Sequence, residues 1–143
     1  MACGIHTLGE NRVQEYLSKK EFYAKDASVH FIGLAEEINR HAARIQKVQN
    51  VLIEVNVGGE ASKSGVDPEQ LEELLLGVAQ LSNVHVQGLM TIPPATGDEK
   101  FLFRMQQLFL DISAKKMDNI DMEILSMGMS GDYAAAIRYG STL

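Results

Sequence analysis

The sequence predicts an α/β fold in which helices cover a parallel β-sheet. Short runs of β-branched and other apolar residues alternate with longer segments whose apolar residues recur every three or four positions. The run VLIEVNV at 51–57 is typical of a strand that is buried on both faces, as strands of parallel sheets are. Strand and helix patterns alternate along the whole chain, and this order is the one that builds a parallel sheet with crossover helices.

Five strands are predicted, and each is followed by a short loop. We place them at His6–Gly9, Val29–Gly33, Val51–Val57, Val84–Ile92 and Met122–Met127. Ligands of such folds bind at the carboxyl ends of the strands, which share one rim. We therefore expect the residues at the strand ends to face that rim: 9–11, 31–33, 56–59, 90–94 and 126–130.

Three helices are predicted from the spacing of apolar residues. The clearest one begins with Asp67 as N-cap and Pro68 at the first helical position. Its apolar stripe consists of Leu71, Leu74, Leu75 and Val78. The stripes of the other two are Leu34, Ile38, Ala42 and Ile45, and Leu102, Met105, Leu108, Phe109 and Ile112. We expect all three stripes to pack into the core.

Composition limits the classes of protein and partner. The 143 residues suit a single domain over 1–143, and 45% hydrophobic with 22% charged residues is typical of a globular protein. The net charge of −6 argues against binding to nucleic acid or to an anionic membrane. With one cysteine, Cys3, and neither a signal-peptide pattern nor a membrane-length apolar run, we expect a cytoplasmic protein without a disulfide framework. The four histidines lack the spacing of a metal site.

The segment LSMGMSGDYAAAIRYGSTL at 125–143 predicts a binding site for phosphate. Backbone N–H groups in Gly/Ser turns point outward and carry partial positive charge, and hydroxyl groups add further donors. The candidate ligands form two clusters: Ser126, Gly128 and Ser130, and then Gly140, Ser141 and Thr142. Asp132 is predicted to support the first turn of the helix between them.

Five segments, in this order, resemble the pyridoxal-phosphate homeostasis family (the YggS/PROSC type): HTLGENRVQE, HFIG, VLIEVNVGGEASKSGV, GLMTIPP and LSMGMSGDYAAAIRYGST. The resemblance runs from Gly4 to Thr142 and implies a parallel (β/α)8 barrel of the TIM or alanine racemase N-terminal type. It also adds Met129 to the first cluster and implies that pyridoxal 5′-phosphate (PLP) binds at the carboxyl rim, held by the two clusters, with Asn11 beside the ring. Such proteins are carriers or regulators of PLP without catalytic residues, and PLP-dependent enzymes are their possible clients.

The chain departs from this family at three places. The Schiff-base lysine of the family is expected in a segment resembling AVSK before Gly4, and that segment is absent here. A helix and a fourth strand are missing after Gly33, and the final strand, with an arginine near the cofactor, would begin beyond Leu143. About five of eight strands remain, which cannot close a barrel. Three explanations stay open: a shortened protein with an altered sheet, a barrel closed by another chain, or segments of a full-length barrel that this sequence omits.

Alternative functions also follow from the residues. Lys63 could replace the missing lysine, although a loop lysine that touches the cofactor or a partner is the simpler interpretation. A second hypothesis is a PLP-dependent amino-acid racemase. Such an enzyme needs acid/base groups on both faces of the substrate, one of them from a second domain. A third hypothesis is a module that binds phosphate ligands noncovalently. The oligomeric state stays open.

Overall fold

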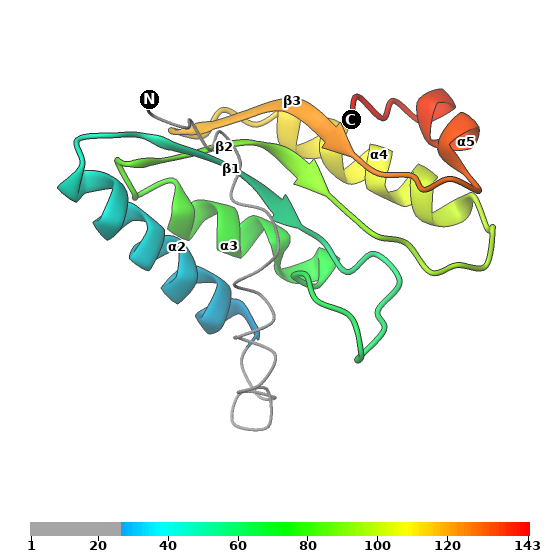
Figure 1. Cartoon of the computed structure of the whole chain (residues 1–143), viewed down its shortest axis with the longest axis horizontal. Coiled ribbons are helices and arrows are strands. Elements are labelled where there is room, and N and C mark those ends of the chain that lie inside the picture. The colour runs from blue at the N-terminus through cyan, green and yellow to red at the C-terminus, as the bar shows by residue number, and fades with distance from the viewer. Residues whose placement is uncertain (1–26) are drawn as a thin grey trace, which may run out of the picture.

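The computed structural model describes residues 27–143 and contains a three-stranded parallel sheet in the order β1, β2, β3. The strands are β1 (Gln49–Glu54), β2 (Val84–Met90) and β3 (Ile120–Ser126). The helices are α2 (Ala27–Arg44), α3 (Leu71–Val78), α4 (Lys100–Ser113) and α5 (Tyr133–Arg138), and the 3-10 turn η2 (Pro68–Gln70) leads into α3. Helices α2, α3 and α4 lie along one face of the sheet, and α5 lies beyond the carboxyl end of β3 (Figure 1).

Three of the five predicted strands are confirmed, with boundaries shifted by a few residues. The register pairs Val51 with Val86 and Gly88 with Ile124, and it shifts at Val51/Leu52 and at Val86/Gly88. A Cβ atom on Gly88 would lie 1.8 Å from the carbonyl oxygen of Ile124. Only glycine lets β2 approach β3 this closely, which explains the glycine within an otherwise apolar strand.

The core lies between the sheet and the helices, and the stripes of α3 and α4 form much of it. Asp67 caps η2 by accepting a 2.9 Å hydrogen bond from the Glu69 N–H, and Pro68 follows at the start, as predicted. The predicted stripes of both helices face the core: Leu71, Leu74, Leu75 and Val78 of α3 and Leu102, Met105 and Ile112 of α4 are buried, and Leu108 and Phe109 are partly buried. The helical spacing therefore correctly predicted these two faces.

The predicted strand at Val29–Gly33 is wrong, because this segment belongs to α2. Phe31 and Ile32 pack against the core together with Ala35 and Ile38, which is a helical spacing. A short apolar run does not distinguish a strand from a buried helical turn, and Gly33, which suggested the end of a strand, lies inside α2. The predicted stripe is correct at Ile38 and Ala42, but Leu34 and Ile45 are 48% and 70% exposed.

Of the four predicted strands that fall in the described part, three are therefore present. The predicted strand at His6–Gly9 lies outside the described residues, as does Asn11. Within residues 27–143, β1 and β3 are the two edges of the sheet, and no barrel is closed there. In the same range, no helix is long and apolar enough to cross a membrane.

Candidate functional site

The carboxyl ends of the three strands point to the same side of the molecule, where three loops form a rim (Figure 1). The loop after β1 is fixed by Asn56. Its Nδ2 donates to the Glu60 carbonyl at 2.8 Å, and its Oδ1 accepts from the Glu60 N–H at 3.2 Å. Buried Thr91, just after β2, donates from Oγ1 to the Val55 carbonyl at 2.7 Å and so ties the ends of β1 and β2 together.

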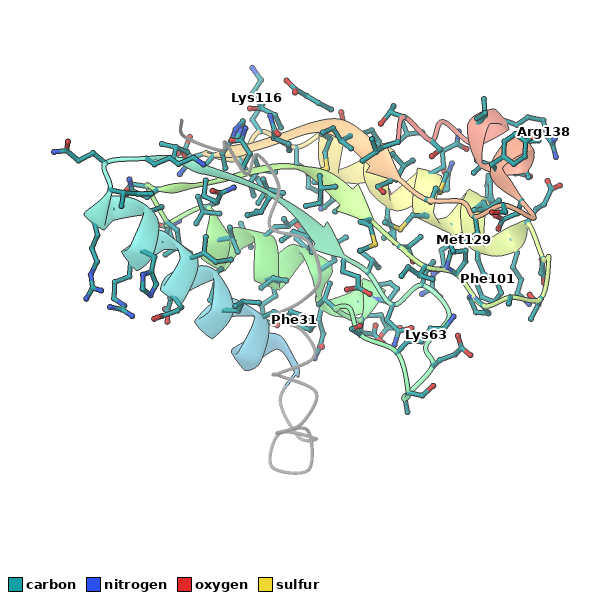
Figure 2. The ribbon with its side chains drawn as sticks, in the orientation of Figure 1. Phe31, Lys63, Phe101, Lys116, Met129 and Arg138 are labelled. Atoms are coloured by element: carbon teal, nitrogen blue, oxygen red, sulfur yellow. The ribbon has the colours of Figure 1, made fainter. Side chains whose placement is uncertain are left out.

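Lys63 links the first loop to the second. Its Nζ donates to the carbonyl oxygens of Ile92 and Pro93 at 3.4 and 3.1 Å. It also lies 2.8 Å from the Glu60 carboxylate, as an ion pair rather than a directed hydrogen bond. Figure 2 shows Lys63 in the loop between β1 and α3. An ammonium group with these acceptors has no lone pair to attack an aldehyde, so the contacts favour the interpretation of Lys63 as a loop lysine.

The turn after β3 contains the first predicted cluster. Gly128 has φ +104°, and a Cβ atom there would lie 2.7 Å from the Ala136 Cβ. Among the described residues, no hydrogen-bond partner occurs for the N–H groups of Gly128, Ser130 and Gly131 or for the hydroxyls of Ser126 and Ser130. The turn therefore offers three backbone donors and two hydroxyls to an anion.

Asp132, which is predicted to support the first turn of α5, is the N-cap residue of that helix, and its carboxylate makes no capping bond to it. Its Oδ1 instead accepts from the Met129 N–H at 2.5 Å. The carboxylate thus supports the turn that precedes the helix. The Met129 N–H is occupied by this bond, and Met129 itself is 61% exposed.

The second predicted cluster closes α5 and returns the chain to β3. Gly140 has φ +88°, and the Ser141 N–H reaches back to the Ala136 carbonyl at 3.0 Å, which is the six-to-one bond of a glycine-terminated helix. The Ser141 Oγ donates to the Met127 carbonyl at 2.7 Å. Thr142 bonds Leu125 twice, through its N–H to the Leu125 carbonyl and through its Oγ1 to the Leu125 N–H, both at 2.9 Å. These bonds place the second cluster beside the first.

The far end of α5 is attached to the start of α4. Arg138, labelled in Figure 2, donates from Nη2 to the Glu99 carboxylate at 2.8 Å. The same carboxylate, near the Tyr139 hydroxyl, raises the pKa of Tyr139 above its ordinary value. The Tyr139 ring also packs edge-on against Phe103 of α4, with 6.3 Å between ring centroids. Between the second loop and α5 lies a small cavity of about 170 Å³, lined partly by Pro94, Leu102 and Arg138.

The structure therefore brings together seven of the eight predicted site residues: Ser126, Gly128, Met129, Ser130, Gly140, Ser141 and Thr142. The eighth, Asn11, is not among the described residues. Sequence reasoning missed Glu99 and its neighbours at the end of α5, Arg138 and Tyr139. No local signal connects residues 39 positions apart, because only tertiary packing brings them into contact.

Comparisons with known proteins identify related sequences. The family described as alanine racemase, N-terminal domain, matches residues 3–143. A pyridoxal phosphate homeostasis protein of Aquifex aeolicus is 41% identical over 169 residues, which include 99% of this chain and 74% of that protein. The protein of the same name from Pseudomonas aeruginosa is 36% identical over 170 residues, covering 99% and 71%. Because the first alignment has 169 positions and this chain 143 residues, at least 26 positions of the Aquifex protein have no counterpart here.

Solved structures share the fold. The crystal structure of an unknown protein from Bifidobacterium adolescentis superposes with a TM-score of 0.73 at 37% identity, over 78% of this chain and 46% of that one. PipY of Synechococcus elongatus, in a structure with PLP bound, superposes with a TM-score of 0.64 at 25% identity, over 77% and 52%. The chain thus matches about half the length of these structures, whose fold is a TIM-barrel-like α/β fold. The chain belongs to the pyridoxal phosphate homeostasis protein family and contains an alanine racemase N-terminal domain.

Proposed function

We propose that this protein binds PLP and acts in PLP homeostasis as a carrier or regulator of the cofactor. One observation carries the proposal: the turn after β3 presents the N–H groups of Gly128, Ser130 and Gly131 without partners in the described structure. Family membership and the PLP-bound structure of PipY support PLP, rather than another phosphate ester, as the ligand. PLP supplies an aldehyde that reacts with amino groups.

In this proposal, the phosphate lies against the first cluster, Ser126, Gly128, Met129 and Ser130. The second cluster, Gly140, Ser141 and Thr142, flanks it, and Asn11 lies beside the ring. Ser141 contacts the phosphate only if its hydroxyl exchanges the bond to Met127 for one to a phosphate oxygen. Residues 1–143 act as one domain, and the proposed partners are PLP and the PLP-dependent enzymes that receive it.

Titration with three ligands tests the proposal. We expect PLP to bind more tightly than pyridoxal, which lacks the phosphate, and inorganic phosphate to compete with PLP. Equal affinity for PLP and inorganic phosphate would indicate a general anion site instead. Borohydride reduction and peptide mass spectrometry would then show whether any lysine is modified, and modification of Lys63 would contradict its assignment as a loop lysine.

The hydroxyls of the turn provide the matched variants. Replacing Ser126 and Ser130 together with alanine removes two donors, each expected to contribute about tenfold to the binding of a charged phosphate. Ser113→Ala is the control, because Ser113 ends α4 at the opposite end of that helix from the rim. An unchanged PLP affinity in the double variant would place the phosphate elsewhere.

A further inference from the structure

We infer that Glu99 is a positioning residue for the phosphate site, acting through Arg138 and Tyr139 at the end of α5. This inference rests on the proposed function, because it concerns how the same site is held. Glu99 does not belong to either cluster and lies before α4, on the loop that follows β2. Its carboxylate accepts a 2.8 Å hydrogen bond from Arg138, the last residue of α5, and it lies near the hydroxyl of Tyr139, which follows the helix.

The reason that this contact matters is the small size of α5. The helix has six residues, of which only Ala135 and Ala136 are buried. Two alanines bury little apolar surface, so packing alone holds the helix weakly. Both clusters are joined directly to its ends: the turn 128–132 enters it, and Gly140–Thr142 leaves it.

Two attachments act on this helix from outside the segment. One is the edge-on packing of Tyr139 on Phe103, and the other is the hydrogen bond of Arg138 to Glu99. The Glu99 contact fixes the angle of α5 relative to α4. A Cβ atom on Gly128 would lie 2.7 Å from the Ala136 Cβ, so the turn lies close against α5, and a change of that angle moves the turn as well. The geometry of the donors in the turn thus depends on a carboxylate that does not touch the ligand.

The contact is exposed, with Arg138 at 62% and Glu99 at 46% of side-chain exposure, so its effect is modest. Removing an exposed ion pair changes an equilibrium constant by up to about fivefold. We therefore expect Glu99→Gln to weaken PLP binding about two- to fivefold while leaving the affinity for pyridoxal unchanged, because only the phosphate end of the site is displaced.

Asp98→Asn is the matched control. Asp98 is the adjacent carboxylate, and it pairs with Lys100 at 2.8 Å rather than with α5. Both variants remove one negative charge near the phosphate. If the effect were purely electrostatic, both variants would bind PLP with the same affinity as the unaltered protein or with a higher one. Weaker binding in Glu99→Gln alone identifies positioning. Equal changes in the two variants, or an equal loss of PLP and pyridoxal affinity in Glu99→Gln, would overturn the inference.

Two further measurements complete the test. The double variant Glu99→Gln/Arg138→Gln is expected to bind PLP no more weakly than the more affected single variant, because the two side chains act through one contact. Additive losses would contradict this.

Amide hydrogen exchange is expected to be faster at 128–142 in Glu99→Gln than in Asp98→Asn, and equal exchange would also count against the inference. If the unaltered protein binds no PLP, the proposed function fails, whereas the exchange rates still decide whether Glu99 holds α5.

Discussion

Gly128 and Ala136 face each other so closely that a Cβ atom on Gly128 would lie 2.7 Å from the Ala136 Cβ. Gly128 belongs to the turn after β3, and Ala136 is a buried residue of α5. This contact sets how near the helix lies to the strand end. The turn of the proposed phosphate site is therefore shaped by a glycine that has both a left-handed φ and no room for a side chain.

Gly128→Ala is expected to destabilise the protein by about 1–3 kcal/mol, because it combines a left-handed φ with a steric clash. Urea unfolding measures the change. Gly131→Ala, three residues on, is the control, since a Cβ atom there meets nothing within 4 Å. Equal stability of the two variants would show that the turn rearranges to accommodate a Cβ atom on Gly128 at little cost in unfolding free energy.

Leu75→Ala tests the core under the sheet. Leu75 is 0% exposed and packs in the cluster beneath the strands, so its truncation leaves a cavity and is expected to cost about 2–5 kcal/mol of unfolding free energy. The neighbouring Leu76 is 54% exposed, and Leu76→Ala is expected to change stability by less than about 0.5 kcal/mol. A reversed order in thermal or urea unfolding would contradict the orientation of α3.

Thr91→Val tests the bond that joins the ends of β1 and β2. Valine keeps the shape of threonine but leaves the buried Val55 carbonyl without the 2.7 Å bond from Oγ1, at an expected cost of about 1–3 kcal/mol. Thr91→Ser keeps the hydroxyl and loses only a methyl group. We expect the serine variant to be the more stable of the two in urea unfolding, and the opposite order would show that the methyl group matters more than the bond.

The pH dependence of Tyr139 tests the contact to Glu99 without any ligand. The pKa of Tyr139 is raised by the Glu99 carboxylate near its hydroxyl. The stability from this contact is fully present below about pH 10, the pKa of an unfolded tyrosine, and it is lost as the pH rises through the higher folded pKa. Ultraviolet absorbance follows this titration, and Tyr139→Phe identifies its share among the four tyrosines. In Glu99→Gln we expect Tyr139 to ionise at lower pH, and an unchanged titration would show that the contact does not form in solution.

The sequence by itself determined the features that depend on local chemistry. Asp67 and Pro68 marked the start of a helix, the leucine spacing after them identified its buried face, and the β-branched run at 51–57 identified a strand. The Gly/Ser pattern after β3 likewise placed two clusters near one strand end, because small residues and left-handed glycines are properties of the residues themselves. The motifs that resemble the pyridoxal-phosphate homeostasis family were also sufficient to identify it.

Only the tertiary structure decided the remaining features. Phe31 and Ile32 suit a strand or a helix equally, and the core contact of α2 selects the helix. The roles of Ser141 and Thr142 depend on their bonds to Met127 and Leu125, which exist only because α5 turns the chain back onto β3. Glu99 meets Arg138 across 39 positions of sequence. Such pairings depend on how separate elements pack in space, and local residue preferences contain no information about them.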